Sequence, residues 1–291
     1  MPSKLSIHIR DYPENIWDDV SRMQPRVVKV FDHNSEMNID ALKRVARPLV
    51  IFRQATPNND FQTRSAESFV AELEQTGTLS KLAGRGILWE GINEPGIGDD
   101  GTEANRKRAK ALNDWYVRFA ELMHNRGEKV AGFSWSTGNP TDRQLQWIIP
   151  LVTGAAAAVD AHAFHEYAKP RSGTPFSDWG RYRLFERALP AHARKPVVIT
   201  EAGVDDIGDA GTSGWAAQMT AGQYLELLAR YDQAISADNY VLGATIYTLK
   251  DPNWPSLRSM ATYWAAWPTT WPARVAVPCW VRPGQCRISR Q

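Results

Sequence analysis

Two glutamates stand at the ends of apolar segments and could do acid, base or nucleophilic chemistry. The segment Ile87–Ile92 runs into an Asn-Glu-Pro sequence that contains Glu94, and the segment Val197–Thr200 runs into Glu201. Hydrolysis of a glycosidic bond needs such a pair, because one carboxyl group protonates the leaving oxygen while the other attacks the sugar or activates water. The sequence therefore predicts a site with two carboxylates, provided that the fold brings these segments together.

Eight short apolar or β-branched segments are spaced widely enough for a helix and a return loop between them, as parallel strands require. They are Leu5–Ile9, Val27–Phe31, Leu49–Arg53, Ile87–Ile92, Val130–Trp135, Val159–His165, Val197–Thr200 and Val241–Thr248. Eight alternations of strand and helix predict an α/β fold, a single (β/α)8 TIM barrel, with a doubly wound sheet as the alternative. Active sites of TIM barrels lie at the C-terminal ends of the strands, where Glu94 and Glu201 stand.

The intervals between the segments carry helical patterns. In Thr102–Arg126, apolar residues recur with helical spacing, Thr102 can begin the helix, and Gly127 can end it. We expect further helices over Ala41–Ala46, Ala66–Glu74, Asp142–Leu151, Tyr182–Leu189 and Gln218–Ile235. Pro150 should end or kink its helix, because proline lacks the backbone N–H that an α-helix needs.

Length and composition fit one catalytic domain over residues 1–291. Hydrophobic residues make up 43% and charged residues 23%, which is typical of a soluble globular protein. The 34 basic and 32 acidic residues nearly balance, so nucleic acid is not an expected partner. No apolar run approaches the roughly 20 residues of a membrane span. We expect a monomer, and the compartment stays open: no secretory signal is visible, yet a secreted mature form is compatible with the sequence.

The C-terminal segment 254–291 differs from the rest, because it holds five of the 12 tryptophans and five prolines. We expect it to pack on the barrel as an aromatic tail, with sugar stacking on some of its rings as the alternative. Both cysteines, Cys279 and Cys286, lie in this segment, and the sequence does not decide whether they form a disulfide.

The chain resembles the retaining glycoside hydrolases of the clan A superfamily, nearest to families 5 and 39, over roughly residues 5–250. In that superfamily an Asn-Glu pair ends the fourth strand and a glutamate ends the seventh, as Asn93, Glu94 and Glu201 do here. The resemblance implies that Glu94 is the acid/base, Glu201 the nucleophile, and Asn93 a donor to the sugar 2-hydroxyl. It implies a β-linked oligo- or polysaccharide as the substrate, and neither a metal nor an organic cofactor.

A second motif supports this resemblance at the sixth strand. His165 and Tyr167 are similar to the His-x-Tyr sequence often found there in these enzymes, whose tyrosine contacts the nucleophile. Residues two apart in a strand share one face, so both side chains should belong to the same subsite. A tyrosine hydroxyl that donates to Glu201 would stabilise its carboxylate form.

Four further residues are candidates for the site. Trp135, at the end of the fifth strand, could line the cleft, and Tyr247 stands on the eighth strand, where the clan usually has a tryptophan below the reacting sugar. The second strand lacks the arginine that many members use to hold the nucleophile. Arg53 or Lys29 could take its place.

Two other functions stay open. A metal-dependent barrel hydrolase would use Asp160, His162 and His165 near Glu201, but His162 and His165 are three residues apart and should point to opposite faces of a strand. A non-catalytic sugar-binding barrel would keep the aromatic cleft without turnover. The presence of both glutamates argues against that alternative.

Overall fold

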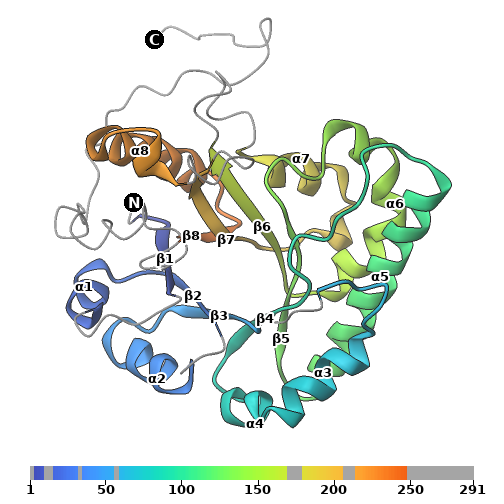
Figure 1. Ribbon diagram of the computed structural model, residues 1–291, viewed down its shortest axis with the longest axis horizontal. Helices are drawn as coiled ribbons and strands as arrows, with labels where there is room; N and C mark the ends of the chain where they lie inside the picture. The colour runs from blue at the N-terminus through green and yellow to red at the C-terminus, as the bar shows by residue number, and fades with distance from the viewer. Residues whose placement is uncertain are drawn as a thin grey trace, which may run out of the picture.

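The computed structural model describes residues 3–9, 16–31, 35–55, 59–168, 179–205 and 214–247. In this part of the chain eight parallel strands close into a barrel in the order β1 to β8, as Figure 1 shows. The predicted (β/α)8 barrel is confirmed, and the doubly wound sheet is excluded. The tail 254–291 and both cysteines lie outside the described residues.

The strands agree closely with the segments expected from the sequence. They are β1 (Leu5–Ile9), β2 (Val27–Phe31), β3 (Leu49–Arg53), β4 (Ile87–Glu90), β5 (Lys129–Trp135), β6 (Ala161–Ala168), β7 (Val197–Val204) and β8 (Val241–Ile246). The largest difference is at β6 and β7, which continue beyond their predicted ends because they pair with each other up to Ala168 and Val204. Glu201 therefore lies within β7 rather than just after it.

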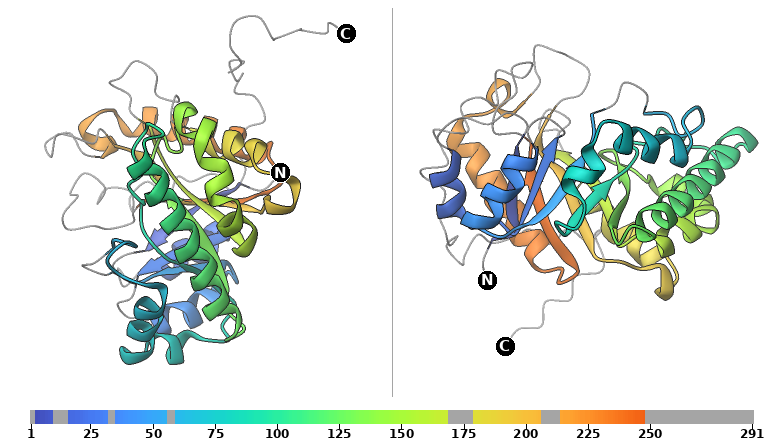
Figure 2. Two further views of the ribbon diagram at one scale, coloured as in Figure 1. Left: turned by 90° about the vertical axis from the view of Figure 1, so that its right-hand side faces the viewer. Right: turned by 90° about the horizontal axis from the view of Figure 1, so that it is seen from below.

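Helices cover the outside of the barrel, as the two views of Figure 2 show. They are α1 (Ile16–Met23), α2 (Ser35–Val45), α3 (Ala66–Gln75), α4 (Thr78–Leu82), α5 (Glu103–His124), α6 (Asp142–Ala158), α7 (Arg181–Ala188) and α8 (Ala221–Ser236), with 3₁₀ turns η2 (Ala191–Ala193) and η3 (Trp215–Ala217). Thr102 caps α5 as expected, since its hydroxyl accepts from the Asn105 N–H. Among the described helices, none is long and apolar enough to span a membrane.

Helix α6 continues past Pro150 to Ala158, so the end predicted at Leu151 is wrong. A proline removes one backbone hydrogen bond from the helix interior. Here the side chains before and after it, Ile148 and Val152, are fully buried, and α6 packs along α5. This packing outweighs the lost hydrogen bond, and the proline itself faces solvent.

The barrel interior is apolar in the middle and charged at the C-terminal ends of the strands. Its apolar layer consists of Val27, Ile51, Leu88, Ala131, Ala161, Ala163 and Val198. Because strand side chains alternate, the next inward positions on β2, β3 and β4 belong to Lys29, Arg53 and Glu90. The apolar layer therefore forms a packed floor beneath a layer of charged side chains.

Candidate active site

Two irregularities in the sheet turn polar side chains into the mouth of the barrel. The pairing of β5 with β6 shifts between Gly132 and Trp135, where Ser134 has a φ of 44°. The pairing of β6 with β7 shifts just before His165, which then lies opposite Glu201. Bulges of this kind are common at barrel rims, where they re-aim side chains.

Glu94 is held just beyond β4 in an unusual backbone conformation. Its φ is 47°, in the left-handed region that residues other than glycine seldom adopt. Its N–H donates to the Ser134 carbonyl at 3.1 Å, while the side chain of Asn59 holds both backbone polar groups of Asn93. The Glu94 side chain is 39% exposed, so it can meet a ligand that enters from solvent.

Glu201 is buried and surrounded by cations and donors. Its Oε1 lies 3.0 Å from Lys29 Nζ and 3.1 Å from an Arg53 guanidinium nitrogen. Its Oε2 accepts a hydrogen bond from the Tyr167 hydroxyl at 2.8 Å and lies 3.6 Å from His165 Nδ1. Arg53 is itself steadied by the Phe31 ring, 4.7 Å away.

These neighbours keep Glu201 ionised. Burial by itself would raise the pKa of this carboxyl, but the positive charges of His165, Lys29 and Arg53 outweigh it and hold the pKa well below its usual range. Glu201 therefore carries a negative charge at neutral pH, as a nucleophile must.

His165 bridges the two glutamates. Its Nδ1 lies 2.8 Å from Glu94 Oε1 and 3.6 Å from Glu201 Oε2, so these two oxygens are separated by at most the sum of the two distances. Burial alone would lower the pKa of His165, but the carboxylates of Glu201, Glu90 and Glu94 raise it above its ordinary value of 6.5. The predicted pair of carboxylates is therefore brought together by one imidazole.

The raised pKa of His165 predicts a pH-dependent contribution to stability. A group whose pKa is higher in the folded state than in the unfolded state stabilises the fold when it is protonated. This stabilisation is complete below the pKa of the unfolded state and is lost as the pH rises through the pKa of the folded state. Replacing His165 by glutamine should lower the thermal midpoint by about 2–4 °C near pH 5, with a smaller difference at pH 9. Calorimetry of the wild type and the variant measures the difference in thermal midpoint at each pH. A difference that grows with pH would contradict the raised pKa of His165. Burial raises the pKa of Glu166 to about 7. Glu166 and other such groups are present in both proteins, so their contributions cancel in the difference between the two thermal midpoints.

Sequence reasoning missed Glu90, which lies below the two glutamates and is fully buried. Its Oε2 is 2.7 Å from Lys29 Nζ, and its Oε1 accepts from the hydroxyls of Ser134 and Thr200 at 2.6 and 2.7 Å. Burial would raise its pKa, but the Lys29 charge outweighs burial and lowers it well below the usual range. One feature of the sequence could have indicated this buried ion pair. Glu90 and Lys29 are each the single charged residue within an otherwise apolar strand.

The other expected substrate-binding residues differ in their surroundings. Tyr247 lies at the mouth, half-buried, with its ring centroid 4.9 Å from that of His8 and 6.3 Å from that of Tyr167. Trp135 is buried, stacks on Phe133 and meets the edge of Phe185 in α7, so its ring contacts belong to the helix layer. A role for either side chain in sugar binding stays a prediction.

The residues of the metal-site alternative do not meet. His162 pairs with Glu186 of α7 and with the Ala156 carbonyl, whereas Asp160 contacts His124 and the Val130 N–H. The expectation that His162 and His165 point apart is confirmed. Within the described ranges, no three His, Cys, Asp or Glu side chains are grouped so that they could hold a metal ion.

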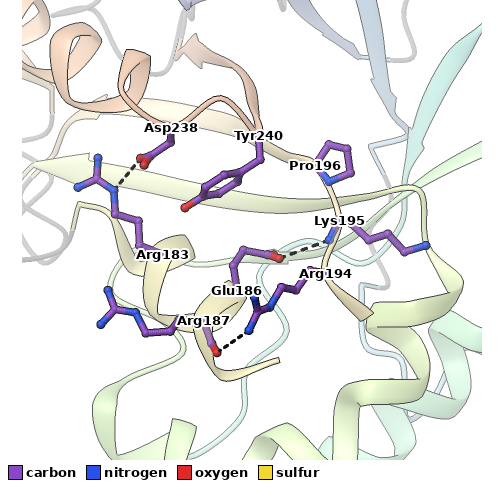
Figure 3. Close-up of a pocket in the computed structure, with 8 residues that line it drawn as sticks. All are labelled: Arg183, Glu186, Arg187, Arg194, Lys195, Pro196, Asp238 and Tyr240. Atoms are coloured by element: carbon purple, nitrogen blue, oxygen red, sulfur yellow. Dashed lines mark hydrogen bonds and ion pairs between the residues drawn. The ribbon is translucent and has the colours of Figure 1, made fainter. Parts of the chain in front are cut away.

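A cavity of about 580 Å³, whose lining residues are drawn in Figure 3, lies away from Glu94 and Glu201. It is lined by Arg183, Glu186, Arg187, Arg194, Lys195, Pro196, Asp238 and Tyr240. Pro196 directly precedes β7 and Tyr240 directly precedes β8, so this cavity lies at the N-terminal ends of the strands. It is therefore separate from the cluster around Glu201.

The fold is similar to those of several solved glycoside hydrolases. No protein-family model and no curated protein matches the sequence. An endo-β-1,3-glucanase from Amycolatopsis mediterranei, in complex with laminaritriose, has a TM-score of 0.55 and 15% identity over 87% of this chain and 92% of that chain. An endo-β-1,4-mannanase from Thermotoga petrophila has a TM-score of 0.55 and 11% identity over 90% and 77%.

A third similar structure is an endo-β-1,3-glucanase from Pseudomonas viridiflava, with a TM-score of 0.53 and 15% identity over 91% of this chain and 98% of that chain. Both glucanases belong to glycoside hydrolase family 128. At sequence identities of 11–15%, the structural similarity to these enzymes establishes the barrel fold alone. The placement nearest to families 5 and 39 stays a prediction.

Proposed function

We propose that this protein is a retaining glycoside hydrolase that cleaves a β-linked oligo- or polysaccharide, acting as a monomer with one catalytic domain. The observation that carries the proposal is the pairing of two different carboxyl groups by one imidazole. Glu201 is buried and held ionised by three cations, whereas Glu94 is exposed and 2.8 Å from His165. Two carboxyl groups in such different surroundings suit two different roles.

In the first step, an oxygen of Glu201 attacks the anomeric carbon and the glycosidic C–O bond breaks. Its electron pair goes to the leaving oxygen, which takes the proton of Glu94. The Tyr167 hydroxyl contacts one carboxylate oxygen of Glu201 and the Arg53 guanidinium contacts the other, so the carboxylate is oriented before the sugar arrives. Asn93, beside Glu94, would donate to the sugar 2-hydroxyl.

In the second step, the Glu94 carboxylate takes a proton from water, and the water oxygen attacks the anomeric carbon. The bond to Glu201 breaks, and its electron pair restores the carboxylate. The exposure of Glu94 supports this role, because water can reach it.

The spacing of the carboxylates favours retention over inversion. Carboxyl groups lie about 5–5.5 Å apart in retaining enzymes and about 6.5–9.5 Å apart in inverting ones, which must fit a water between nucleophile and sugar. His165 contacts one oxygen of each carboxylate, at 2.8 and 3.6 Å, and this close approach of the two groups to one imidazole supports the shorter spacing of a retaining enzyme.

The proposal is tested by incubating the purified protein with β-1,3-glucan, β-1,4-glucan, β-mannan, xylan, galactan and peptidoglycan and measuring new reducing ends. We expect release from at least one of them, with β-1,3-glucan and β-mannan first because the similar folds belong to enzymes named for these substrates. Exhaustive chelation should leave the activity unchanged. Activity that disappears on chelation and returns with zinc would favour the metal-dependent alternative, and sugar binding without release would favour the non-catalytic one.

A further inference from the structure

Lys29 lies between two carboxylates and is fully buried. Its Nζ is 2.7 Å from Glu90 Oε2 and 3.0 Å from Glu201 Oε1. A buried ammonium group is stable only beside a negative charge, since removing one member of a buried ion pair leaves the other uncompensated. The charge of Lys29 therefore depends on Glu90 and Glu201.

Glu90 cannot take part in binding a sugar directly, because its side chain is 0% exposed. It is fixed by the hydroxyls of Ser134 on β5 and Thr200 on β7. The charges that face it are Lys29 from β2, Arg53 from β3, and His165 from β6, whose Nε2 is 3.8 Å from Glu90 Oε1. Any effect of Glu90 on the reaction must pass through these neighbours.

The proposed reaction changes the charge around Lys29. When a Glu201 oxygen bonds to the anomeric carbon, this carboxylate becomes a neutral ester, and the negative charge appears on Glu94 after it gives its proton to the leaving oxygen. Glu94 contacts His165, while the carboxylates paired with Lys29 are Glu90 and Glu201. Throughout the covalent intermediate, Glu90 is therefore the anion left beside Lys29.

We propose that Glu90 is a positioning residue that acts through Lys29, balancing its charge while Glu201 is esterified. This inference rests on the proposed function. It explains why the chain keeps a third carboxylate, out of reach of any sugar, directly below the nucleophile. Without it, forming the glycosyl-enzyme would leave a buried ammonium unpaired and would be slowed.

The charge loss at Glu201 can be reproduced without substrate by the variant Glu201→Gln. The ionisation of Lys29 is followed by NMR of protein labelled with ¹⁵N-lysine. We expect Lys29 to lose its proton at a pH about two units lower or more in Glu201→Gln with Glu90→Gln than in Glu201→Gln alone. Equal titration of Lys29 in these two variants would overturn the proposal.

A matched control is Glu201→Gln with Glu186→Gln, which removes a buried carboxylate at the other end of the barrel and should leave the titration of Lys29 unchanged. If the variant lacking both Glu201 and Glu90 does not fold, Lys29→Met is added to it, because removing the unpaired ammonium should restore folding. Urea unfolding measures this. A triple variant no more stable than the double variant would also overturn the proposal.

The kinetic readout uses dinitrophenyl β-laminaribioside and dinitrophenyl β-mannobioside. Glu90→Gln should lower kcat/KM, which reports the formation of the glycosyl-enzyme, by about 100-fold. Glu90→Asp, which keeps the charge, should recover part of the loss. An unchanged kcat/KM would contradict the proposal. If the wild type hydrolyses no β-glycoside, the proposed function fails, while the substrate-free titration still decides whether Glu90 balances Lys29.

Discussion

Replacing Glu201 by glutamine is expected to lower kcat by about 10⁴-fold or more, because a neutral amide is a poor nucleophile. The amide oxygen can still accept from Lys29, while the amide NH2 can donate to the Tyr167 hydroxyl. The amide also occupies the same volume as the carboxylate, so the barrel should stay folded. The loss should persist at every pH, since no proton equilibrium turns the amide into a carboxylate. Initial rates on the most reactive glycan measure the effect.

The control for this prediction is the conservative variant Tyr167→Phe, which removes one hydrogen bond to Glu201 at 2.8 Å and keeps the nucleophile. It should lose far less activity than Glu201→Gln. Circular dichroism must show the same fold in both variants. Near-normal activity of a folded Glu201→Gln protein would refute its role as the nucleophile.

Glu94→Gln should produce a loss that depends on the leaving group. On a natural glycan, kcat should fall by about 10²–10⁴-fold, because the leaving oxygen must then depart without a proton. On a dinitrophenyl β-glycoside the first step needs no acid, so we expect a rapid burst of dinitrophenol followed by slow turnover, as water attacks the intermediate without a general base. Stopped-flow absorbance measures the burst and the slow phase.

Azide provides the second arm of this test. This small anion needs no general base, so it should speed up the slow phase of Glu94→Gln and form a glycosyl azide, but it should not rescue Glu201→Gln. Equal losses on good and poor leaving groups, without rescue by azide, would remove Glu94 from the acid/base role.

The fold, and the position of Glu94 and Glu201 at the same end of the barrel, could be predicted because they depend on local sequence patterns. Eight apolar segments with helical intervals are sufficient for a barrel, and the barrel itself fixes which strand ends share the mouth. Strand alternation likewise placed His165 and Tyr167 together, and both reach Glu201. These inferences need only the period of a strand and the direction of the chain.

Other features depended on contacts between distant residues and could not be predicted. The bulge at Ser134 turns its hydroxyl onto Glu90, but the register of β5 against β6 depends on packing that no single segment specifies. The helix across Pro150 is held by buried neighbours on both sides. Lys29 was one of two candidates for holding the nucleophile, and the structure brings both Lys29 and Arg53 to Glu201.

The central claim is that Glu94 and Glu201 hydrolyse a β-glycosidic bond with retention of configuration. The most direct test is to follow the first minutes of cleavage by ¹H NMR, on the glycan from which the protein releases reducing ends, and to identify the anomer that appears first. Double displacement predicts that the new reducing end is β at first and becomes α only by slow mutarotation. A first product with the α configuration would contradict the account.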